Sequence, residues 1–384
     1  MAYRIRIDGT TVYDQRNPDK AYQVIDPTWT QEVNKADSLV FTIPYGGHGY
    51  DAPIPMTSEV VLWEDGTIIF RGRVLKCKRT MYGDKIVTCE GDLGWLNDSI
   101  VRPCKWTGRD LEFIRWILSN HNSQVEASRR IFPADTTASG TTDIKIELED
   151  YEDSLSLLTE NWRHEITSAS GQSVSRLVMR WEESNGQITS YLGWSASGAS
   201  LLSGEVQLGK NLLDISHMIN GEDVYTVIVP LGASVDTDET DSEGNTIKRP
   251  LTIASVNDGK DYLTASASVL SQYGKIWRTV NFSEIGPDDD TTEAQAAQQL
   301  KEAGQKELDQ NLTAAVTLEA SAIDLSKCGY NVRSFRLGDF HRVKHQLLGI
   351  DEDFVLQKIE LKLDRIERSR YRFGRERKAL TDQV

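Results

Sequence analysis

Near the end of the chain, residues Arg336 to Asp364 form the stretch "RLGDFHRVKHQLLGIDEDFVLQKIELKLD". Within it, "HRVKH" places His341 and His345 four residues apart, the histidine spacing of a zinc-protease helix. On a helix, two such side chains lie about 5–6 Å apart and can share one metal ion. On a strand they lie about 13 Å apart, which no single zinc ion with bonds of about 2.0–2.1 Å can bridge. The backbone conformation therefore decides between a metal site and a structural element.

The residues around the two histidines favour a strand. Gly338-Asp339, just before them, is typical of a turn. Downstream, "KIELKLD" alternates apolar and charged residues and so places Ile359, Leu361 and Leu363 on one face. The motif also lacks the Glu that follows the first His of a zinc protease and serves as its general base. We therefore predict a β-hairpin joined by the loop "QLLGIDED", with no metal site.

Composition indicates a multidomain globular protein. The chain has 384 residues, 39% of them hydrophobic and 26% charged, which suggests two to four domains. A net charge of −15 argues against a general nucleic-acid binder, because phosphate contacts need a basic surface. The first ten residues, "MAYRIRIDGT", show no signal peptide, and no segment reaches the roughly 18 apolar residues of a membrane span. We expect synthesis in the cytosol and no membrane insertion.

The four cysteines form no C-x-x-C pair, so neither a zinc ribbon nor a thioredoxin motif is present. Cys77 and Cys89 are symmetric about Gly83 in a predicted hairpin and could face each other across two strands. For a cytosolic protein, two buried free thiols are the favoured interpretation.

Residues 1–100 are predicted to be β-structure. "YRIRIDGTTVYD" and "EVVLWEDGTIIFRGRVLKCKR" are strand pairs around the Asp8-Gly9 and Asp65-Gly66 turns, and "DSLVFTIPY" alternates like a half-buried strand. Short strands punctuated in this way are typical of a barrel or a sandwich.

Residues 101–200 predict a small α+β domain. The segment "TGRDLEFIRWILSNHN" has helical spacing, and Thr107 with Asp110 suggests a variant of the capping box. A second helix, "EDSLSLLTENWRHEI", carries Leu155, Leu158 and Trp162 on one face. Two strands, "SRLVMRWEES" and "QITSYLGW", follow and are joined at Asn185-Gly186.

The rest of the chain returns to β-structure around one insertion. The acidic stretch "SVDTDETDSEGNTIKRP" predicts an exposed loop or hairpin tip. "TTEAQAAQQLKEAGQKELDQNL" is a clear helix, with a capping box at Thr292 and Gln295 and a narrow apolar stripe. That stripe consists of Ala297, Leu300, Gly304 and Leu308.

Other candidate chemistry is weak. Ser195 in "GWSASG" lacks the second Gly and the following helix of a nucleophile elbow, so a Ser-rich loop is favoured. In "DTDETDSEG", Asp241 stands where a calcium-binding EF-hand loop needs Gly. A solvated acidic tip is favoured there over a looser cation site. No catalytic constellation assembles, and we expect no catalytic residue, cofactor or metal.

The basic stretch "RIERSRYRFGRERK" leaves two interpretations open. If it is a strand, Arg368, Arg370 and Arg372 share one face. That face is either a solvated edge that resists aggregation, or a rim that meets an acidic partner or lines a passage.

Laid end to end, the chain resembles the hub proteins of phage tails, the tail-associated lysin or "prophage endopeptidase tail" family. The resemblance covers nearly the whole chain and depends on pieces in the right order and spacing. These are "DSLVFTIPY", "MTSEVVLWEDGTIIFRGRVL", "KIVTCEGDLGWLNDSI", "LGKNLLDI", "YTVIVPLGA", "LTIASVNDGKDYL", the stretch from Arg336 to Gly374, and "LTD". The chain ends at Val384, whereas larger members continue into a cell-wall-degrading domain, so the resemblance implies a hub without that enzyme.

The resemblance implies a β-rich α+β fold with two small β-barrel-like tube domains, an inserted α+β domain and a peripheral insertion. The tube domains would be residues 1–100 and 201–235 plus 313–384, and the peripheral domains 101–200 and 236–312. It also implies a homotrimeric ring of six similar domains in the virion tail, assembled in the host cytoplasm.

The partners implied are a distal tail protein hexamer, the tape measure protein and tail fibre or receptor-binding proteins. DNA would be present only in transit through the lumen. Since negative walls avoid binding DNA, we expect the face of Arg368, Arg370 and Arg372 to point away from the lumen, toward a neighbouring subunit or fibre. His341 and His345 are further candidates for a subunit interface, where protonation would tune assembly.

Two alternatives belong to other functional classes. One is a tail-associated cell-wall hydrolase, a peptidase that uses His341, His345 or Ser195. The other is a module that binds host-wall glycans through exposed aromatic residues such as Trp194.

Overall fold

The computed structural model describes residues 2–134, 143–161, 175–196, 203–219, 224–240, 246–283, 285–287, 291–313, 316–332 and 334–374. The chain divides into two compact units, residues 1–216 with 318–374 and residues 217–317. The first unit is built mainly from one large sheet of 13 strands, so the predicted β-rich α+β fold is confirmed.

The N-terminal half of this sheet follows the predicted hairpins. Its strands are β1 Tyr3–Ile7, β2 Thr10–Asp14, β3 Ile25–Glu32, β4 Ser38–Ile43, β5 Glu59–Glu64, β6 Thr67–Arg79 and β7 Lys85–Gly91. Asp8 and Gly9 have φ of 46° and 78°, and Asp65 and Gly66 have φ of 49° and 92°. Two successive positive φ values make the tight turn whose twist matches that of the flanking strands.

The C-terminal half contains β15 Ser203–Gln207, β16 Leu212–Ile219, β22 Val316–Ala322, β23 Phe340–His345, β24 Ile350–Lys362 and β25 Arg370–Gly374. The predicted hairpin of "HRVKH" is confirmed: β23 and β24 are antiparallel, with His341 opposite Phe354 and His345 opposite Ile350. On the other side of β23 lies β15, which runs parallel to it.

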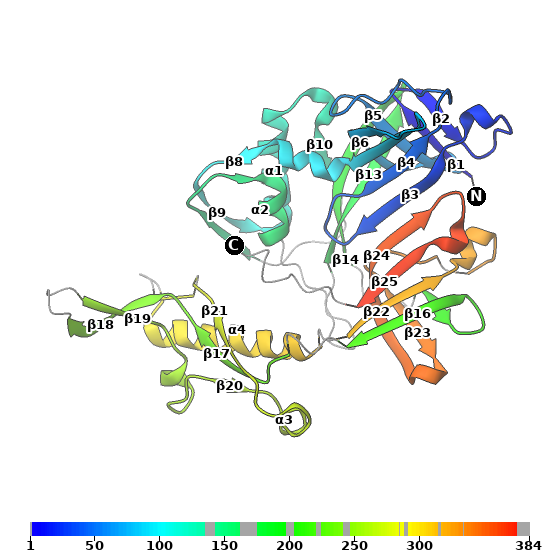
Figure 1. The fold of residues 1–384 in the computed structure, drawn as a ribbon. Coiled ribbons are helices and arrows are strands. Elements are labelled where there is room, and N and C mark those ends of the chain that lie inside the picture. Colours follow the sequence, from blue (N-terminus) through cyan, green and yellow to red (C-terminus); the bar gives the residue numbers. More distant parts are fainter. Residues whose placement is uncertain are drawn as a thin grey trace. The chain divides into compact units, whose positions relative to one another are not determined.

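Strand β24 joins the two halves. Its first part pairs with β23, and its second part pairs with β25 on one side and β3 on the other. Leu361 of β24 therefore lies opposite Trp29 of β3, over 300 residues away in the chain. The hydrogen-bonded order along the sheet is β16-β22-β25-β24-β3-β4-β7-β6-β5-β1-β2, and Figure 1 shows strands from both ends of the chain side by side.

Strict alternation assigns one face of the sheet to the core. Leu39, Phe41 and Ile43 of β4 are at most 1% exposed, as their spacing predicts. Cys89 is buried too, but it lies opposite Val74, while Cys77 lies opposite Val87. The two thiols are therefore not cross-strand partners, and both cysteines are free.

The segment after β7 forms an α+β layer within the first unit. Its elements are β8 Ile100–Val101, β9 Cys104–Arg109, α1 Asp110–Gln124, β10 Ile131–Pro133, β11 Asp143–Leu148, β12 Glu152–Asp153, α2 Ser154–Asn161, β13 Ser175–Ser184 and β14 Gln187–Ala196. The predicted cap of α1 was wrong, because Thr107 belongs to β9. Instead, Glu112 accepts a hydrogen bond from the backbone N–H of Arg109 at 3.0 Å. Trp162 lies outside the described residues.

The second unit packs one helix on a small sheet. Its elements are β17 Val227–Leu231, β18 Ser234–Thr240, β19 Thr246–Pro250, β20 Leu263–Thr264, α3 Ala267–Tyr273, β21 Trp277–Asn281 and α4 Glu293–Thr313. The capping box of α4 is confirmed, since Thr292 N–H donates to Gln295 Oε1 and Gln295 N–H donates to Thr292 Oγ1. The predicted stripe of α4 is buried against strands β17 and β20.

Short 3₁₀ helices complete the described chain. They are η1 Lys20–Tyr22, η2 Asp92–Asp98, η3 Ala127–Arg129, η4 Ala254–Val256, η5 Leu325–Cys328, η6 Gln346–Leu348 and η7 Ile366–Arg368. Among the helices in the described ranges, none is long and apolar enough to cross a membrane.

The junction between β24 and β3 gives a first prediction. Leu361 is 2% exposed, so Leu361→Ala should lower the free energy of unfolding by about 2–5 kcal/mol through lost burial and a cavity. Leu347→Ala is the matched control, because Leu347 is 85% exposed and its truncation should change stability by less than about 0.5 kcal/mol. Urea titration of both variants measures the difference, and equal values would contradict a packed junction.

Candidate functional site

The two histidines of "HRVKH" lie inside the chain. His341 is 0% exposed, and its ring makes edge-to-face contacts with Phe335 and Phe373 at centroid distances of 5.3 and 5.9 Å. Nδ1 of His345 accepts a hydrogen bond from the backbone N–H of Leu348 at 3.1 Å and so shapes the turn into η6. Both rings thus have structural contacts within one chain, and an interface role for them stays a prediction.

Residues that could bind a metal ion do not cluster in the part of the chain that the structure describes. Within those residues, no group of three or more His, Cys, Asp or Glu side chains is placed to hold a metal ion. Ser195 lies in strand β14, rather than at the strand-to-helix turn of a nucleophile elbow. Asp241 lies outside the described residues, as do the side chains of Trp194 and Asp236.

The basic stretch is only partly a strand. Arg370 and Arg372 belong to β25 and alternate with the buried Tyr371 and Phe373. Arg368 instead ends the 3₁₀ helix η7, so the premise of one continuous strand with three arginines on a face was wrong. Arg368 and Arg370 still line a common shallow hollow of about 510 Å³.

The face of the sheet opposite the core is polar and accessible to solvent. Register places the following side chains on it: Thr28, Thr30, Ser38, Val40, Thr42, Ile86, Thr88, Lys358, Glu360, Lys362, Arg370 and Arg372. We call this set the polar face. It runs across β24 without interruption, because the pairing of β24 with β3 keeps the alternation of the two halves in phase.

Ion pairs neutralise part of the charge on the polar face. Lys362 Nζ lies 3.1 Å from Asp26 Oδ1 and donates to Thr28 Oγ1 at 2.8 Å. Lys358 Nζ lies 3.6 Å from Glu32 Oε2. Such partly exposed pairs add little stability, about 0–1 kcal/mol each, but they leave the surface with mixed charge.

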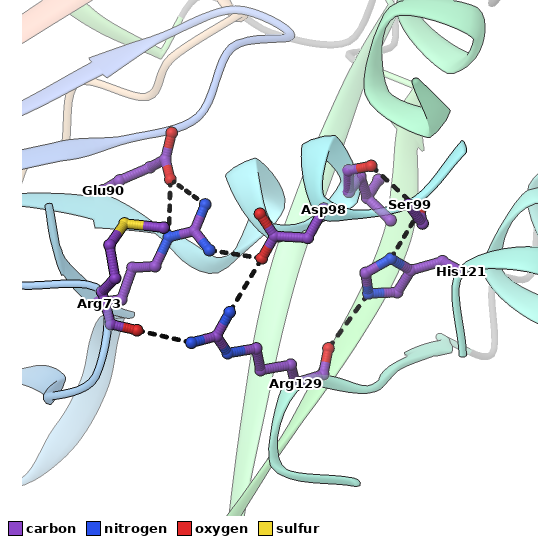
Figure 2. Close-up of polar contacts among 8 residues, drawn as sticks. Arg73, Glu90, Asp98, Ser99, His121 and Arg129 are labelled. Carbon is purple, nitrogen blue, oxygen red and sulfur yellow. Dashed lines mark hydrogen bonds and ion pairs between the residues drawn. The ribbon is translucent and has the colours of Figure 1, made fainter. Parts of the chain in front are cut away.

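Arg73 of β6 and Arg129 of η3 connect the α+β layer to the sheet. Arg73 donates to Glu90 Oε2 at 2.9 Å and to Asp98, and Arg129 donates to the same Asp98 oxygen at 3.1 Å and to Met56 O at 2.6 Å (Figure 2). Since Arg73 is 5% exposed, removing either carboxylate would leave a buried charge without one of its partners.

A buried histidine continues this network. His121 Nε2 lies 3.2 Å from the backbone oxygen of Arg129 and Nδ1 lies 2.9 Å from Ser99 Oγ (Figure 2). Ser99 Oγ also lies within hydrogen-bond distance of Ser154 Oγ, at 2.7 Å. Burial lowers the pKa of His121, so the neutral ring is favoured, with Nε2–H donating to the carbonyl.

Two carboxylates lie near the contact between β3, the start of η2 and the β13–β14 hairpin. Asp37 Oδ2 accepts from Trp29 Nε1 at 3.0 Å and from Gln31 Nε2 at 3.3 Å. Burial raises the pKa of Asp37 to about 7, and the nearby Asp92 adds to the shift. Hydrogen bonds from neutral donors do not offset the lost hydration of the charge.

Asp92 has the same kind of environment. Its Oδ2 accepts from Trp181 Nε1 at 2.6 Å and from Ser190 Oγ at 2.5 Å. Burial raises the pKa of Asp92 to about 6, although Arg71 opposes the shift. Sequence reasoning missed both carboxylates. The partners of Asp92 come from strands 89 and 98 residues away, whereas Asp37 meets Trp29 and Gln31 of the neighbouring strand β3.

These shifts predict a pH dependence of stability. A carboxyl group whose folded pKa is raised stabilises the protein at low pH, and that contribution is lost as pH rises through about 6–7. Between pH 5 and pH 8, the melting temperature of the unmodified chain should therefore fall relative to that of the double variant Asp37→Asn/Asp92→Asn. His121 has the opposite sign, since its lowered pKa costs stability as pH falls through its ordinary value of 6.5, but it is present in both proteins. Parallel melting curves over pH 5–8 would contradict the assignment.

Comparisons with known proteins agree with this architecture. The family described as "Prophage endopeptidase tail" matches residues 203–384. Among curated proteins, none matches the chain. The 43 kDa tail protein of prophage MuSo2 from Shewanella oneidensis has a similar structure, with a TM-score of 0.59 at 11% identity over 98% of both chains.

Two further solved structures are similar over nearly their full length. A tail protein from Neisseria meningitidis MC58 gives a TM-score of 0.57 at 14% identity and covers 98% of this chain and 97% of that one. A prophage tail protein from Listeria monocytogenes EGD-e gives 0.55 at 12% identity and covers 100% and 97%. At such identities the likeness establishes the fold, and the resemblance to phage tail proteins seen in the sequence is confirmed.

Proposed function

Because residues 203–384 match the model of a phage tail family and the whole chain has the fold of prophage tail proteins, we propose that this protein is the structural hub of a phage tail tip or baseplate. Three copies form a ring that closes the tail tube. The ring joins a distal tail protein hexamer and the tape measure protein to tail fibre or receptor-binding proteins, and it opens for DNA ejection. The hub works in the virion tail without catalysis and assembles in the host cytoplasm.

The observation that carries this proposal is the pairing of β24 with β3. It sets two β-blocks side by side in one sheet within a single chain. In the proposed domain scheme, residues 1–100 and 201–235 plus 313–384 are the tube domains, with 101–200 and 236–312 at the periphery, although β17 (Val227–Leu231) lies in the second unit. Three chains then supply six similar blocks, which matches the symmetry of a hexameric neighbour.

The ends of the sheet support a ring. Strands β2 and β16 end the hydrogen-bonded path, and each has one strand partner among those described. An unpaired edge is a template for another strand, and closing a sheet on itself removes such edges. Pairing of one chain's β2 side with the next chain's β16 side would close the ring.

Oligomeric state tests the ring. Light scattering on the purified protein, or quantitative mass measurement of assembled tails, should give three copies of the chain. A single copy in assembled tails would exclude the trimeric hub.

The arginines provide a second test. We propose that Arg368, Arg370 and Arg372 meet a neighbouring subunit or a fibre, and replacing Arg370 and Arg372 by Glu should weaken trimer formation at least about tenfold, or about 1.4 kcal/mol. Arg102→Glu is the control at an exposed position of the same chain. Normal trimers with altered DNA release would instead place these arginines along the passage.

A peptidase is the competing function. His341 and His345 lie on a strand and are buried, which does not suit a shared zinc ion. Zinc analysis with a peptidoglycan digestion assay distinguishes the two functions. Stoichiometric zinc that is lost in His341→Ala would establish the enzyme and remove the purely structural role. Binding of isolated wall glycans would support the adhesion module.

A further inference from the structure

The loop between β4 and β5 forms one wall of an open hollow of about 790 Å³ in the first unit. Most residues from 45 to 52 line this hollow, and Thr10 of β2 and Arg79 at the end of β6 complete it. Its volume lies within the range of about 300–1,000 Å³ for ligand pockets. No residue lines both this hollow and the pocket beside Asp37 and Asp92.

The loop that forms the wall has a fixed shape. Gly46 and Gly49 adopt φ of 75° and 71°, and a Cβ on Gly49 would lie 2.6 Å from Val12 Cγ1 of β2. The backbone N–H of His48 donates to Ala21 O at 2.9 Å and ties the loop to the segment before β3. Since glycines have no side chain, peptide groups form this part of the wall. The hollow is therefore present before any ligand arrives, which lowers the cost of binding.

Two tyrosine rings form the aromatic part of the hollow. The hydroxyl of Tyr50 donates to Gly83 O at 2.5 Å, and Lys85 Nζ lies 4.2 Å from the centroid of the Tyr50 ring. The ring of Tyr45 meets that of Tyr50 edge to face at a centroid distance of 5.7 Å. Tyr45 is nevertheless 74% exposed, so much of its ring surface is open to a ligand.

The charged groups at the hollow have opposite signs. The guanidinium of Arg79 lies 6.0 Å from the Tyr50 ring centroid and, among the described residues, makes no ion pair. The side chain of Asp51 is 90% exposed and lies 3.7 Å from Lys85 Nζ. A guanidinium only donates hydrogen bonds, a carboxylate only accepts them, and a hydroxyl group does both. A ligand with several hydroxyl groups therefore matches both side chains, whereas a simple anion or cation would be repelled by one of them.

A protein segment suits the hollow less well. The cores of protein interfaces are rich in apolar and aromatic side chains and poor in charged ones. The lining here contains no Val, Leu, Ile, Phe, Met or Trp, and Ala52 supplies its one aliphatic side chain. Aromatic rings beside peptide groups and two charged side chains fit a small polar ligand better than an apolar anchor.

We propose that this hollow binds a short neutral saccharide. One sugar ring lies on the exposed face of Tyr45, because its C–H groups carry partial positive charge and the face of an aromatic ring is negative. Its hydroxyl groups donate to Asp51 and accept from Arg79. The inference does not depend on the tail function, and its failure would leave the test of the trimeric ring unaffected.

Saturation-transfer NMR with the full chain tests the ligand class. The probes are the neutral trisaccharides chitotriose, maltotriose and cellotriose, and trigalacturonate is the anionic control of the same length. At least one neutral probe should receive magnetisation, most strongly at its ring C–H protons, and trigalacturonate should bind no more tightly. Transfer to none of the neutral probes would overturn the proposal. Tighter binding of trigalacturonate would overturn it in favour of an anion site at Arg79.

Variants locate the site. Tyr45→Ala should weaken binding of the neutral probe at least about tenfold, whereas Tyr45→Phe should retain it, because the ring and not the hydroxyl makes the stacking contact. Tyr151→Ala is the matched control, since Tyr151 is 67% exposed and does not line the hollow. Melting curves of all three variants should match that of the unmodified chain. Binding that is retained in Tyr45→Ala, or lost equally in Tyr151→Ala, would overturn the assignment to this hollow.

Discussion

The backbone ladder between β24 and β3 is the constraint on which the rest of the first unit depends. It pairs Lys358–Lys362 with Thr28–Glu32. The N-terminal and C-terminal strands therefore form one continuous sheet only when these two distant segments pair. Closing so long a loop has an entropic cost that grows slowly with length, while each apolar residue brought into the shared core, such as Leu361, repays part of it. The same ladder sets the phase of both faces. A slip of one residue would move Leu361 to the polar face and Lys362 into the core.

Much of this sheet could be predicted from local sequence. The Asp-Gly pairs demand positive φ, and the alternation in "DSLVFTIPY" and "KIELKLD" assigns the faces, so hairpins and buried residues followed directly. The partner of β24 on its β3 side could not be predicted, because backbone hydrogen bonds have the same donors and acceptors whatever the side chains. The prediction that Arg368 lies on the same strand as Arg370 and Arg372 was wrong for a related reason. Its spacing suits a strand, but the chain turns through η7 before β25 begins.

The polar network between the sheet and the α+β layer could not be predicted from the sequence, for a different reason. In "FRGRV", Arg71 and Arg73 read as ordinary residues of an exposed hairpin, yet both are 5% exposed. Their partners come from the α+β layer, with Ser190 119 residues from Arg71 and Asp98 25 residues from Arg73. The one local signal is Gly72 between them. A Cβ there would lie 2.0 Å from the backbone oxygen of Glu90, so the two strands approach too closely for any side chain. Two buried arginines on either side of that glycine can reach across to the same neighbouring layer.

The topology also explains how a second unit can exist without disturbing the ladder. Residues 217–317 leave the sheet at the end of β16 and return at the start of β22, and these two strands are direct neighbours in the sheet. The insertion therefore occupies the position of a hairpin connection. The length of the insertion has little effect on the free energy of folding, because each doubling of a loop costs only about 0.6 kcal/mol. This holds provided the exit and entry points stay one strand apart. The insertion also has its own core and a helix with its own cap. The insertion therefore leaves the order of the strands in the large sheet unchanged.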